Sequence, residues 1–231
     1  MSIYAIGDLH FSGTPPQKPM NIFGDNWEGH REKILASWTS TICPKDTVLL
    51  CGDTSWAMDY KTALSDDLAP IIALPGNKII LKGNHDYWWT SLKKMETLSD
   101  NKLSFLQNKF YAVDDIAICG TRGWNLPFLE NFSSEDAAIL KRECGRLETS
   151  LQQASAKNYT DIIVGLHYPP LYKNMESSPF TEIMEKYCVK KCVFGHIHGS
   201  DSENVFQGSK NNIEYRLVAA DYTNFQFVKI T

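Results

Sequence analysis

The sequence has no excess of basic residues, no long apolar run and no stretch of low complexity. Its formal net charge is −4 over 231 residues, and its lysines and arginines are scattered, so a broad electrostatic footprint for duplex nucleic acid is missing. No apolar stretch approaches the roughly 20 residues that span a bilayer, and the opening "MSIYAIGDLH" carries no basic signal region. We expect a cytoplasmic protein without a membrane or extended nucleic-acid partner. The sequence specifies no oligomeric state.

The six cysteines are too thinly spread for a disulfide framework, and no two of them form a CxxC pair. Cys188 and Cys192 lie four residues apart and could form half of a metal site. No second Cys/His pair with zinc-finger spacing accompanies them. We therefore interpret most of the cysteines as small core residues.

What the sequence does contain is a series of short runs rich in β-branched and apolar residues, which are typical of buried strands. Two later runs, "NIEYRLVAA" and "NFQFVKI", alternate more strictly, and the turn-like "DYTN" between them predicts an antiparallel hairpin at the end of the chain. The six earlier runs are "SIYAIGD", "DTVLLCGD", "NKIILKGN", "FYAVDDIAICG", "TDIIVGLH" and "KKCVFGH".

Helical patterns separate these strands. The clearest covers residues 133–156, where Leu140, Cys144, Leu147 and Leu151 form one apolar stripe behind a capping serine. Strands that alternate with helices predict an α/β protein, which we expect to form a single domain over residues 1–231. Other helices are expected over residues 27–41, over residues 60–74 and after Trp88.

The only long segment without a pattern is "FSGTPPQKPMNIFGDN", which follows the first strand and includes the loop from Thr14 to Asn26. Loops of this length are often lids over functional sites, but a packed surface loop fits the sequence equally well.

Polar side chains collect where the predicted strands end, and in α/β sheets ligands bind at the carboxyl ends of the strands. A glycine precedes many of these side chains, which suits a tight turn or the close approach of another group. Residues two apart in an extended segment point to the same side, so each of the pairs Asp8/His10 and His196/His198 could hold one ion. Burying so many ionisable groups without ions would be costly, so the pattern predicts a metal site. The strand-end residues are Asp8, His10, Asp53, Asn84, His85, His167, His196 and His198, and of the six histidines only His30 lies elsewhere.

The ordered series "DLH", "GD", "GNHD", "H" and "GHIH" resembles the calcineurin-like metallophosphoesterase superfamily, over most of the chain from Asp8 to His198. The resemblance implies an α/β protein with a four-layer α/β/β/α sandwich of two mixed sheets flanked by helices. It also implies two divalent transition-metal ions, and oxygen and nitrogen ligands without thiolate suit Mn²⁺, Fe or Zn²⁺. By resemblance, one ion is held by Asp8, His10, Asp53 and His198, and the other by Asp53, Asn84, His167 and His196, with Asp53 bridging.

The same resemblance implies that a hydroxide shared by the ions attacks phosphorus while His85 acts as general acid toward the leaving group. Asp86 could orient His85 or cap the following helix. Arg122, in "CGTRGWN", could bind a phosphate oxygen or form a surface ion pair. The aromatic rings of Trp56, Trp88, Trp89 and Trp124 follow strand ends and could stack on a substrate, although core packing explains them as well.

Within the superfamily, "GNHD" preceded by Lys82 departs from the protein serine/threonine phosphatases, and Trp56 stands where purple acid phosphatases place a tyrosine. We therefore expect a compact bacterial-type phosphohydrolase acting on a small phosphoester, with a phosphodiester as first choice. A phosphomonoester or a pyrophosphate bond is the alternative substrate. A hypothesis of another class is a metal-binding scaffold without catalysis.

Overall fold

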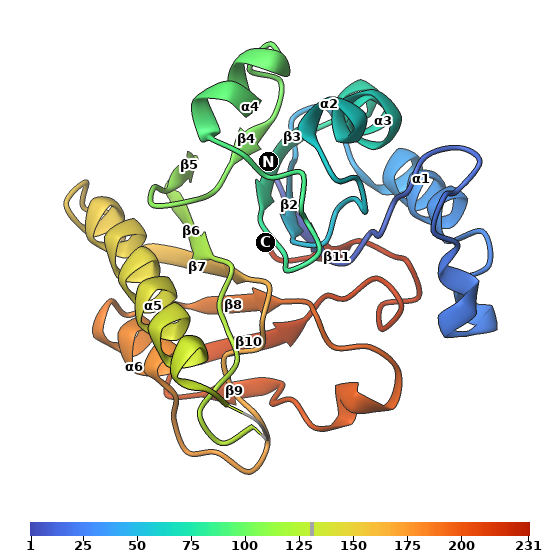
Figure 1. Cartoon of the computed structure of the whole chain (residues 1–231). Coiled ribbons are helices and arrows are strands. Elements are labelled where there is room, and N and C mark those ends of the chain that lie inside the picture. Colours follow the sequence, from blue (N-terminus) through green and yellow to red (C-terminus); the bar gives the residue numbers. More distant parts are fainter. Residues whose placement is uncertain (130–131) are drawn as a thin grey trace.

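The computed structural model of the chain describes residues 1–129 and 132–231. In this part of the chain the strands form two sheets, both mixed (Figure 1). The first sheet has the order β11-β1-β2-β3-β4, and the second β5-β6-β7-β8-β10-β9. The first comprises β1 (Ile3–Ile6), β2 (Thr47–Cys51), β3 (Asn77–Leu81), β4 (Ser104–Phe105) and β11 (Val228–Lys229). The second comprises β5 (Tyr111–Val113), β6 (Ile116–Thr121), β7 (Asp161–Leu166), β8 (Lys191–Phe194), β9 (Gly208–Lys210) and β10 (Ile213–Leu217).

The inner strands are parallel and buried on both faces. β1, β2 and β3 pair in parallel, as do β6, β7 and β8. Every residue of β2 is buried, which explains why its sequence is a continuous apolar run instead of an alternating one. Because the strands of each set run the same way, their carboxyl ends meet at one edge of each sheet.

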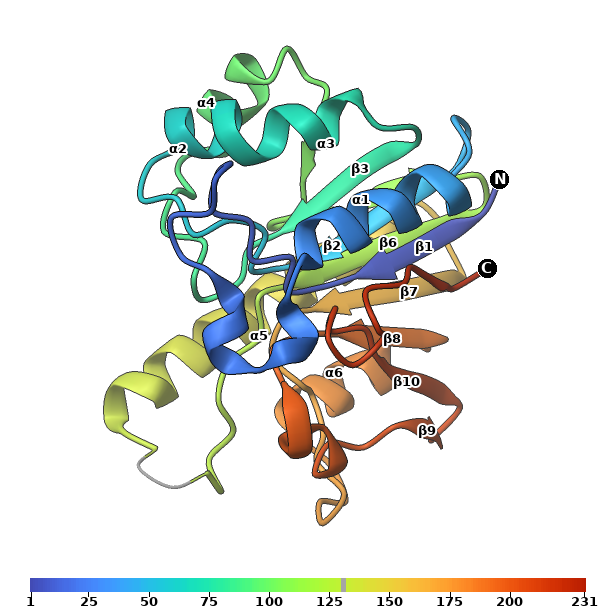
Figure 2. The ribbon, with the colours of Figure 1, turned by 90° about the vertical axis from the view of Figure 1, so that its right-hand side faces the viewer.

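Helices cover the outer face of each sheet, and the two inner faces pack together (Figures 1 and 2). The core between the sheets joins Leu49 and Leu81 of the first sheet to Ile118, Ile163 and Val193 of the second. The predicted four-layer α/β/β/α arrangement is thus confirmed. The helices on the first sheet are α1 (His30–Thr41), α2 (Tyr60–Thr62), the π-helical η3 (Ala63–Leu68), α3 (Ala69–Ala73) and α4 (Leu92–Leu98), and those on the second are α5 (Ser134–Ser155) and α6 (Pro179–Lys186).

The helix predicted over residues 133–156 is present as α5. Ser133 and Asp136 form a reciprocal capping box at its start, and Leu140, Leu147 and Leu151 are buried against the second sheet. The helix predicted over residues 60–74 is also present, as the continuous run of α2, η3 and α3.

Three predictions about elements were wrong. The terminal hairpin does not form, because β10 pairs with β8 and β9 in the second sheet whereas β11 pairs with β1 in the first. The run at residues 110–120 is two antiparallel strands, since it turns at Asp114 and Asp115 between β5 and β6. The helix expected from Trp27 begins only at His30, after two short 3₁₀ turns, η1 (Met20–Phe23) and η2 (Asp25–Trp27).

In the part of the chain that the structure describes, no helix is both long and apolar enough to cross a membrane.

Candidate metal centre

The backbone at four of the predicted ligands is left-handed. Asp8, His10, Asp53 and His196 have φ angles of 60°, 48°, 50° and 74°. Residues other than glycine rarely adopt this conformation, which costs roughly 1–2 kcal/mol each, and such strain collects at functional sites. The expected extended geometry of the pairs Asp8/His10 and His196/His198 is therefore wrong: β1 ends at Ile6 and β8 at Phe194, before either pair.

Glycines allow the loops of the two sheets to meet. A Cβ atom on Gly83 would overlap the Asp53 carboxylate, and one on Gly195 would overlap that of Asp8. The predicted close approach is confirmed at these two positions. Since Gly195 belongs to the second sheet and Asp8 to the first, this contact lies between the sheets.

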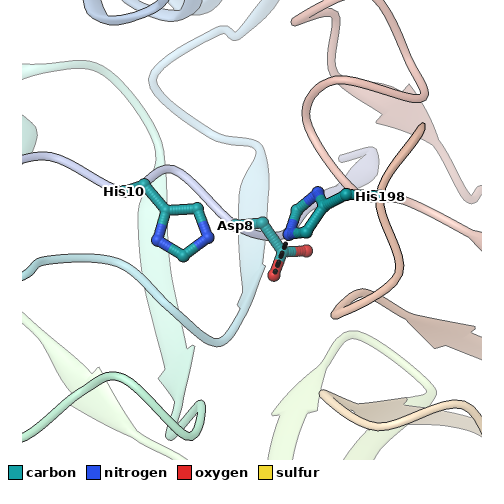
Figure 3. Close-up of side chains that lie close together, drawn as sticks. All are labelled: Asp8, His10 and His198. Atoms are coloured by element: carbon teal, nitrogen blue, oxygen red, sulfur yellow. Dashed lines mark ion pairs between the residues drawn. The ribbon is translucent and has the colours of Figure 1, made fainter. Parts of the chain in front are cut away.

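One group of potential ligand atoms joins Asp8 and His10, after β1, to His198, after β8 (Figure 3). Their nearest ligand atoms all lie within 4.8 Å of one another. His198 Nε2 is 3.7 Å from Asp8 Oδ1, the ion pair that Figure 3 draws as a dashed line. Asp8 and His10 are buried, whereas His198 is about one-third exposed, so the group opens toward solvent on the His198 side.

A second group joins Asp8 and Asp53 to His167, which follows β7. His167 Nε2 lies 3.5 Å from Asp53 Oδ2, 2.6 Å from Asn84 Oδ1 and 3.2 Å from His196 Nδ1. Asp53 Oδ2 is also 3.9 Å from His10 Nε2, so this carboxylate lies between the two groups. All seven residues that the resemblance assigned as metal ligands therefore converge, four from the first sheet and three from the second.

The hydrogen bonds of His167 are consistent with a cation at this position. Its Nδ1 lies 3.0 Å from the carbonyl oxygen of Cys51, which can only accept, so Nδ1 carries the proton. Nε2 is then an unprotonated acceptor that faces the amide oxygen of Asn84. Two acceptors at this distance repel unless a cation lies between or beside them. Asp8 adds a carboxylate, and an oxygen and nitrogen set without thiolate suits a divalent transition metal.

Apart from His198, whose pKa is lowered by burial but raised to about 9 by its hydrogen bond to Asp221, the electrostatics of the buried groups agree with this interpretation. Burial lowers the pKa of His167 to about 3 and lowers the pKa values of His10 and His196 well below their usual value, so all three imidazoles keep a free lone pair. Burial raises the pKa of Asp53 to about 6 and the pKa of Asp8 well above its usual value, and the two carboxylates repel each other. A bound cation would relieve both effects, because it stabilises ionised carboxylates.

His85 lies at the edge of the metal centre and outside both groups of ligand atoms. Its ring packs against Trp56 at a centroid distance of 4.4 Å, and its backbone amide donates to Asp53 Oδ1 (2.8 Å). Its Nδ1 is buried without a hydrogen-bond partner in the described residues. The side chain also lines the cavity beside the predicted ions.

Both predicted roles of Asp86 need correction. Its carboxylate accepts hydrogen bonds from the backbone amides of Asp53, Thr54, Ser55 and Gly83 and from the indole of Trp88, and none of its bonds reaches the His85 ring. It does not cap the following helix either, since the N-cap of α4 is Ser91. A fully buried Asp86 instead ties the loop after β2 to the loop after β3, and so fixes the position of Asp53.

Arg122 forms an ion pair, but a buried one. Its guanidinium stacks on Trp124 at 4.3 Å, and its Nη2 lies 3.7 Å from the fully buried Glu143 of α5. Its Nε is buried without a partner among the described residues, and Arg122 is not among the residues that line the cavity beside the ligands. Its role in substrate binding stays a prediction.

A cavity of about 370 Å³ opens beside the metal ligands. The loop from Thr14 to Asn26 forms one side of it, and the 3₁₀ turn η4 (Gly199–Glu203) forms another; both lie toward the viewer in Figure 2. Of the four tryptophans considered, only Trp56 reaches this cavity, whereas Trp88 is buried in the core of the first sheet. The lining comprises His10, Met20, Phe23, Asn26, Trp27, Asp53, Trp56, His85, His196, His198, Gly199, Ser200 and Asp221.

One residue of this cavity escaped the sequence analysis. Asp221 Oδ1 lies 2.8 Å from His198 Nδ1. Its other oxygen, Oδ2, accepts a hydrogen bond from the backbone amide of Gly199 (3.1 Å). The signal was present, because "RLVAAD" ends a strand with an aspartate as "LLCGD" does. The incorrect terminal hairpin had placed Asp221 in a turn.

Comparison with known families finds a match to the model described as "Calcineurin-like phosphoesterase" over residues 1–200. Among solved structures, the chain is similar to AQ665, a protein of unknown function from Aquifex aeolicus, with 18% identity, a TM-score of 0.53 and coverage of 99% of this chain and 95% of that one. It is also similar to TT1561 of Thermus thermophilus, with 10% identity, a TM-score of 0.56 and coverage of 98% and 96%. At these identities the two structures support the fold alone. The comparison with curated proteins gives no significant match.

Proposed function

The chain belongs to the calcineurin-like phosphoesterase family, and on that premise we propose that it is a hydrolase that uses two divalent transition-metal ions to cleave a small phosphoester. The observation that carries the proposal is the convergence of seven oxygen and nitrogen ligands around the contact between His167 Nε2 and Asn84 Oδ1. A metal-binding scaffold would share this ligand set but would not need His85, a histidine outside the ligand set that lines the cavity beside it.

Each of the two groups of ligand atoms would bind one ion. Asp8, His10 and His198 would hold one ion, and Asn84, His167 and His196 the other, with Asp53 shared between them. When bound, divalent ions lower the pKa of water and neutralise charge on phosphoryl oxygens. His85, which lines the cavity beside these ligands, would donate a proton to the departing oxygen.

The cavity supports a small substrate with an organic group on the phosphate. A volume of about 370 Å³ is at the lower end of the range for small-molecule sites. One side carries the metal ligands, and the other carries apolar side chains, including Met20 and Phe23. A phosphodiester has two organic groups, one of which could lie against this apolar side while the other leaves. We therefore favour phosphodiesters over phosphomonoesters and pyrophosphates.

Hydrolysis of two synthetic esters tests the proposed function. With added Mn²⁺, we expect the protein to hydrolyse bis-p-nitrophenyl phosphate faster than p-nitrophenyl phosphate, measured by release of p-nitrophenolate. Metal content is measured on the same sample. A protein that binds metal but cleaves neither ester would be the scaffold, and faster cleavage of the monoester would reverse the substrate preference.

Phe23 is expected to contact the organic group of the substrate. It lines the cavity with 67% of its surface exposed, so an aromatic group can stack on it. Phe23→Ala should raise KM for bis-p-nitrophenyl phosphate about three- to tenfold with little change in kcat, since stacking contributes about 0.5–1.5 kcal/mol. Ile22→Ala is the matched control, because Ile22 is 74% exposed on the same turn but does not line the cavity. Equal changes in both variants would contradict the contact.

A further inference from the structure

Asp221 is outside the ligand set, but its carboxylate is in hydrogen-bond contact with the ring of a predicted metal ligand. Its Oδ1 lies 2.8 Å from His198 Nδ1, and only 4% of its side chain is exposed. It also lies outside residues 1–200, the part of the chain that the family model matches. This contact is therefore not part of the shared motif series.

The backbone holds Asp221 firmly next to the metal centre. Ala219 forms a bridge with Gly7, and the amide of Ala220 donates to the Gly7 carbonyl (3.0 Å), so the strand end that carries Asp221 is joined to the one that carries Asp8. The amide of Gly199, next to His198, donates to the second carboxylate oxygen of Asp221. The carboxylate thus contacts both the backbone and the ring of the His198 loop.

A carboxylate at this position determines which ring nitrogen of His198 can bind a cation. Asp221 can only accept when ionised, so Nδ1 carries the proton that it donates. Nε2 is left as the atom that can bind a cation in exchange for its proton, and it is this atom that lies 3.7 Å from Asp8 Oδ1. The ring is also fixed from the side by Trp27, whose indole packs edge-on at 5.5 Å.

We infer that Asp221 is a positioning residue that orients His198 and increases the affinity of the Asp8–His10–His198 group for a divalent cation. The inference rests on the metal-binding part of the proposed function and not on its phosphoester chemistry. His167 is oriented instead by the neutral carbonyl of Cys51. In the part of the chain that the structure describes, a carboxylate outside the ligand set hydrogen-bonds a histidine of the first group, His198, and none hydrogen-bonds a histidine of the second, so the surroundings of the two groups differ in charge.

Calorimetric titration of the metal-free chain with Mn²⁺ tests the inference. Asp221→Asn and Asp221→Ala should each weaken one of the two binding events by roughly 10- to 100-fold and leave the other unchanged, the usual effect of removing a partner of a metal-bound histidine. Asp201→Asn is the matched control: Asp201 is exposed on η4 near His198, and its replacement removes the same charge without touching the ring.

A second readout reports on the ring itself. In the Zn²⁺-loaded protein, ¹⁵N NMR of the imidazoles should show a protonated Nδ1 on His198, and this signal should shift or be lost in Asp221→Ala but persist in Asp201→Asn. Circular dichroism tests whether each variant is folded. If Asp221→Ala is unfolded, the comparison uses Asp221→Asn, whose side chain has the same shape as that of aspartate.

The outcomes separate this inference from the proposed function. Wild-type affinity at both sites in the Asp221 variants, or an equal loss in Asp201→Asn, would overturn the role of Asp221 alone. A wild-type chain that binds Mn²⁺ but hydrolyses no phosphoester would overturn the proposed function alone. A wild-type chain that binds no divalent ion would overturn both.

Discussion

Asp53→Ala is expected to lose metal at both positions and to lower turnover by about three orders of magnitude or more. Asp53 Oδ2 lies 3.9 Å from His10 Nε2 and 3.5 Å from His167 Nε2, so its removal takes a ligand from each group. The ions are expected to supply several kcal/mol of charge stabilisation, and each 1.4 kcal/mol is about a factor of ten in rate. Elemental analysis of the purified variant, together with its kcat on bis-p-nitrophenyl phosphate, measures both effects.

The control for this variant lies at the other end of the same strand. Asp46 precedes β2 and is also buried. Its carboxylate accepts hydrogen bonds from the backbone amides of Ser2 and Cys43, and it is remote from the ligands. Asp46→Asn should keep both ions, whereas the isosteric Asp53→Asn should bind them weakly. If one ion remains at full occupancy in Asp53→Ala, Asp53 does not bridge the two sites.

His85→Ala is expected to keep both ions but to lose about 10²- to 10⁴-fold in kcat on esters with strongly basic leaving groups, the usual contribution of a general acid. Esters of p-nitrophenol should lose much less, because p-nitrophenolate departs without a proton. The ring of His85 packs on Trp56 and belongs to neither group of ligand atoms, so metal content should not change. Kinetics on an alkyl and a p-nitrophenyl ester of the same phosphate compare the two cases.

The ratio of the two losses decides the role of His85. A large loss on the alkyl ester alone supports proton donation, because only that ester needs the proton. Losses of equal size on both esters would instead indicate that His85 positions the substrate. Loss of metal would mean that its backbone bond to Asp53 had been disturbed.

Much of the candidate metal centre could be predicted because the proposed ligands follow strands whose pattern is unambiguous. Buried parallel strands have continuous apolar sequences, and a polar residue directly after such a run lies at the sheet edge. That argument located Asp53 and His167 without knowledge of the pairing. The same motifs carried the resemblance that predicted two stacked sheets instead of one.

The errors came where local pattern and long-range pairing disagree. The runs at residues 212–220 and 224–230 look like a hairpin, but β10 and β11 belong to different sheets, a choice made by contacts distant in sequence. The left-handed backbone at Asp8 and His10 could not be predicted either, since non-glycine residues adopt it only where the surrounding structure imposes it. Asp86 was misassigned because its neighbour His85 lies next to it in sequence, whereas its hydrogen bonds run to another loop.

The seven converging ligands come from two separate sheets, and this has a mechanical consequence. Asp8, His10, Asp53 and Asn84 extend from one sheet, and His167, His196 and His198 from the other. A cation shared among them, as proposed, would cross-link the two sheets at this edge. At a free concentration about a thousand times its Kd, such an ion would stabilise the folded chain by about 4 kcal/mol. The concentration of free metal ion would then affect the stability of the folded protein as well as its rate of catalysis.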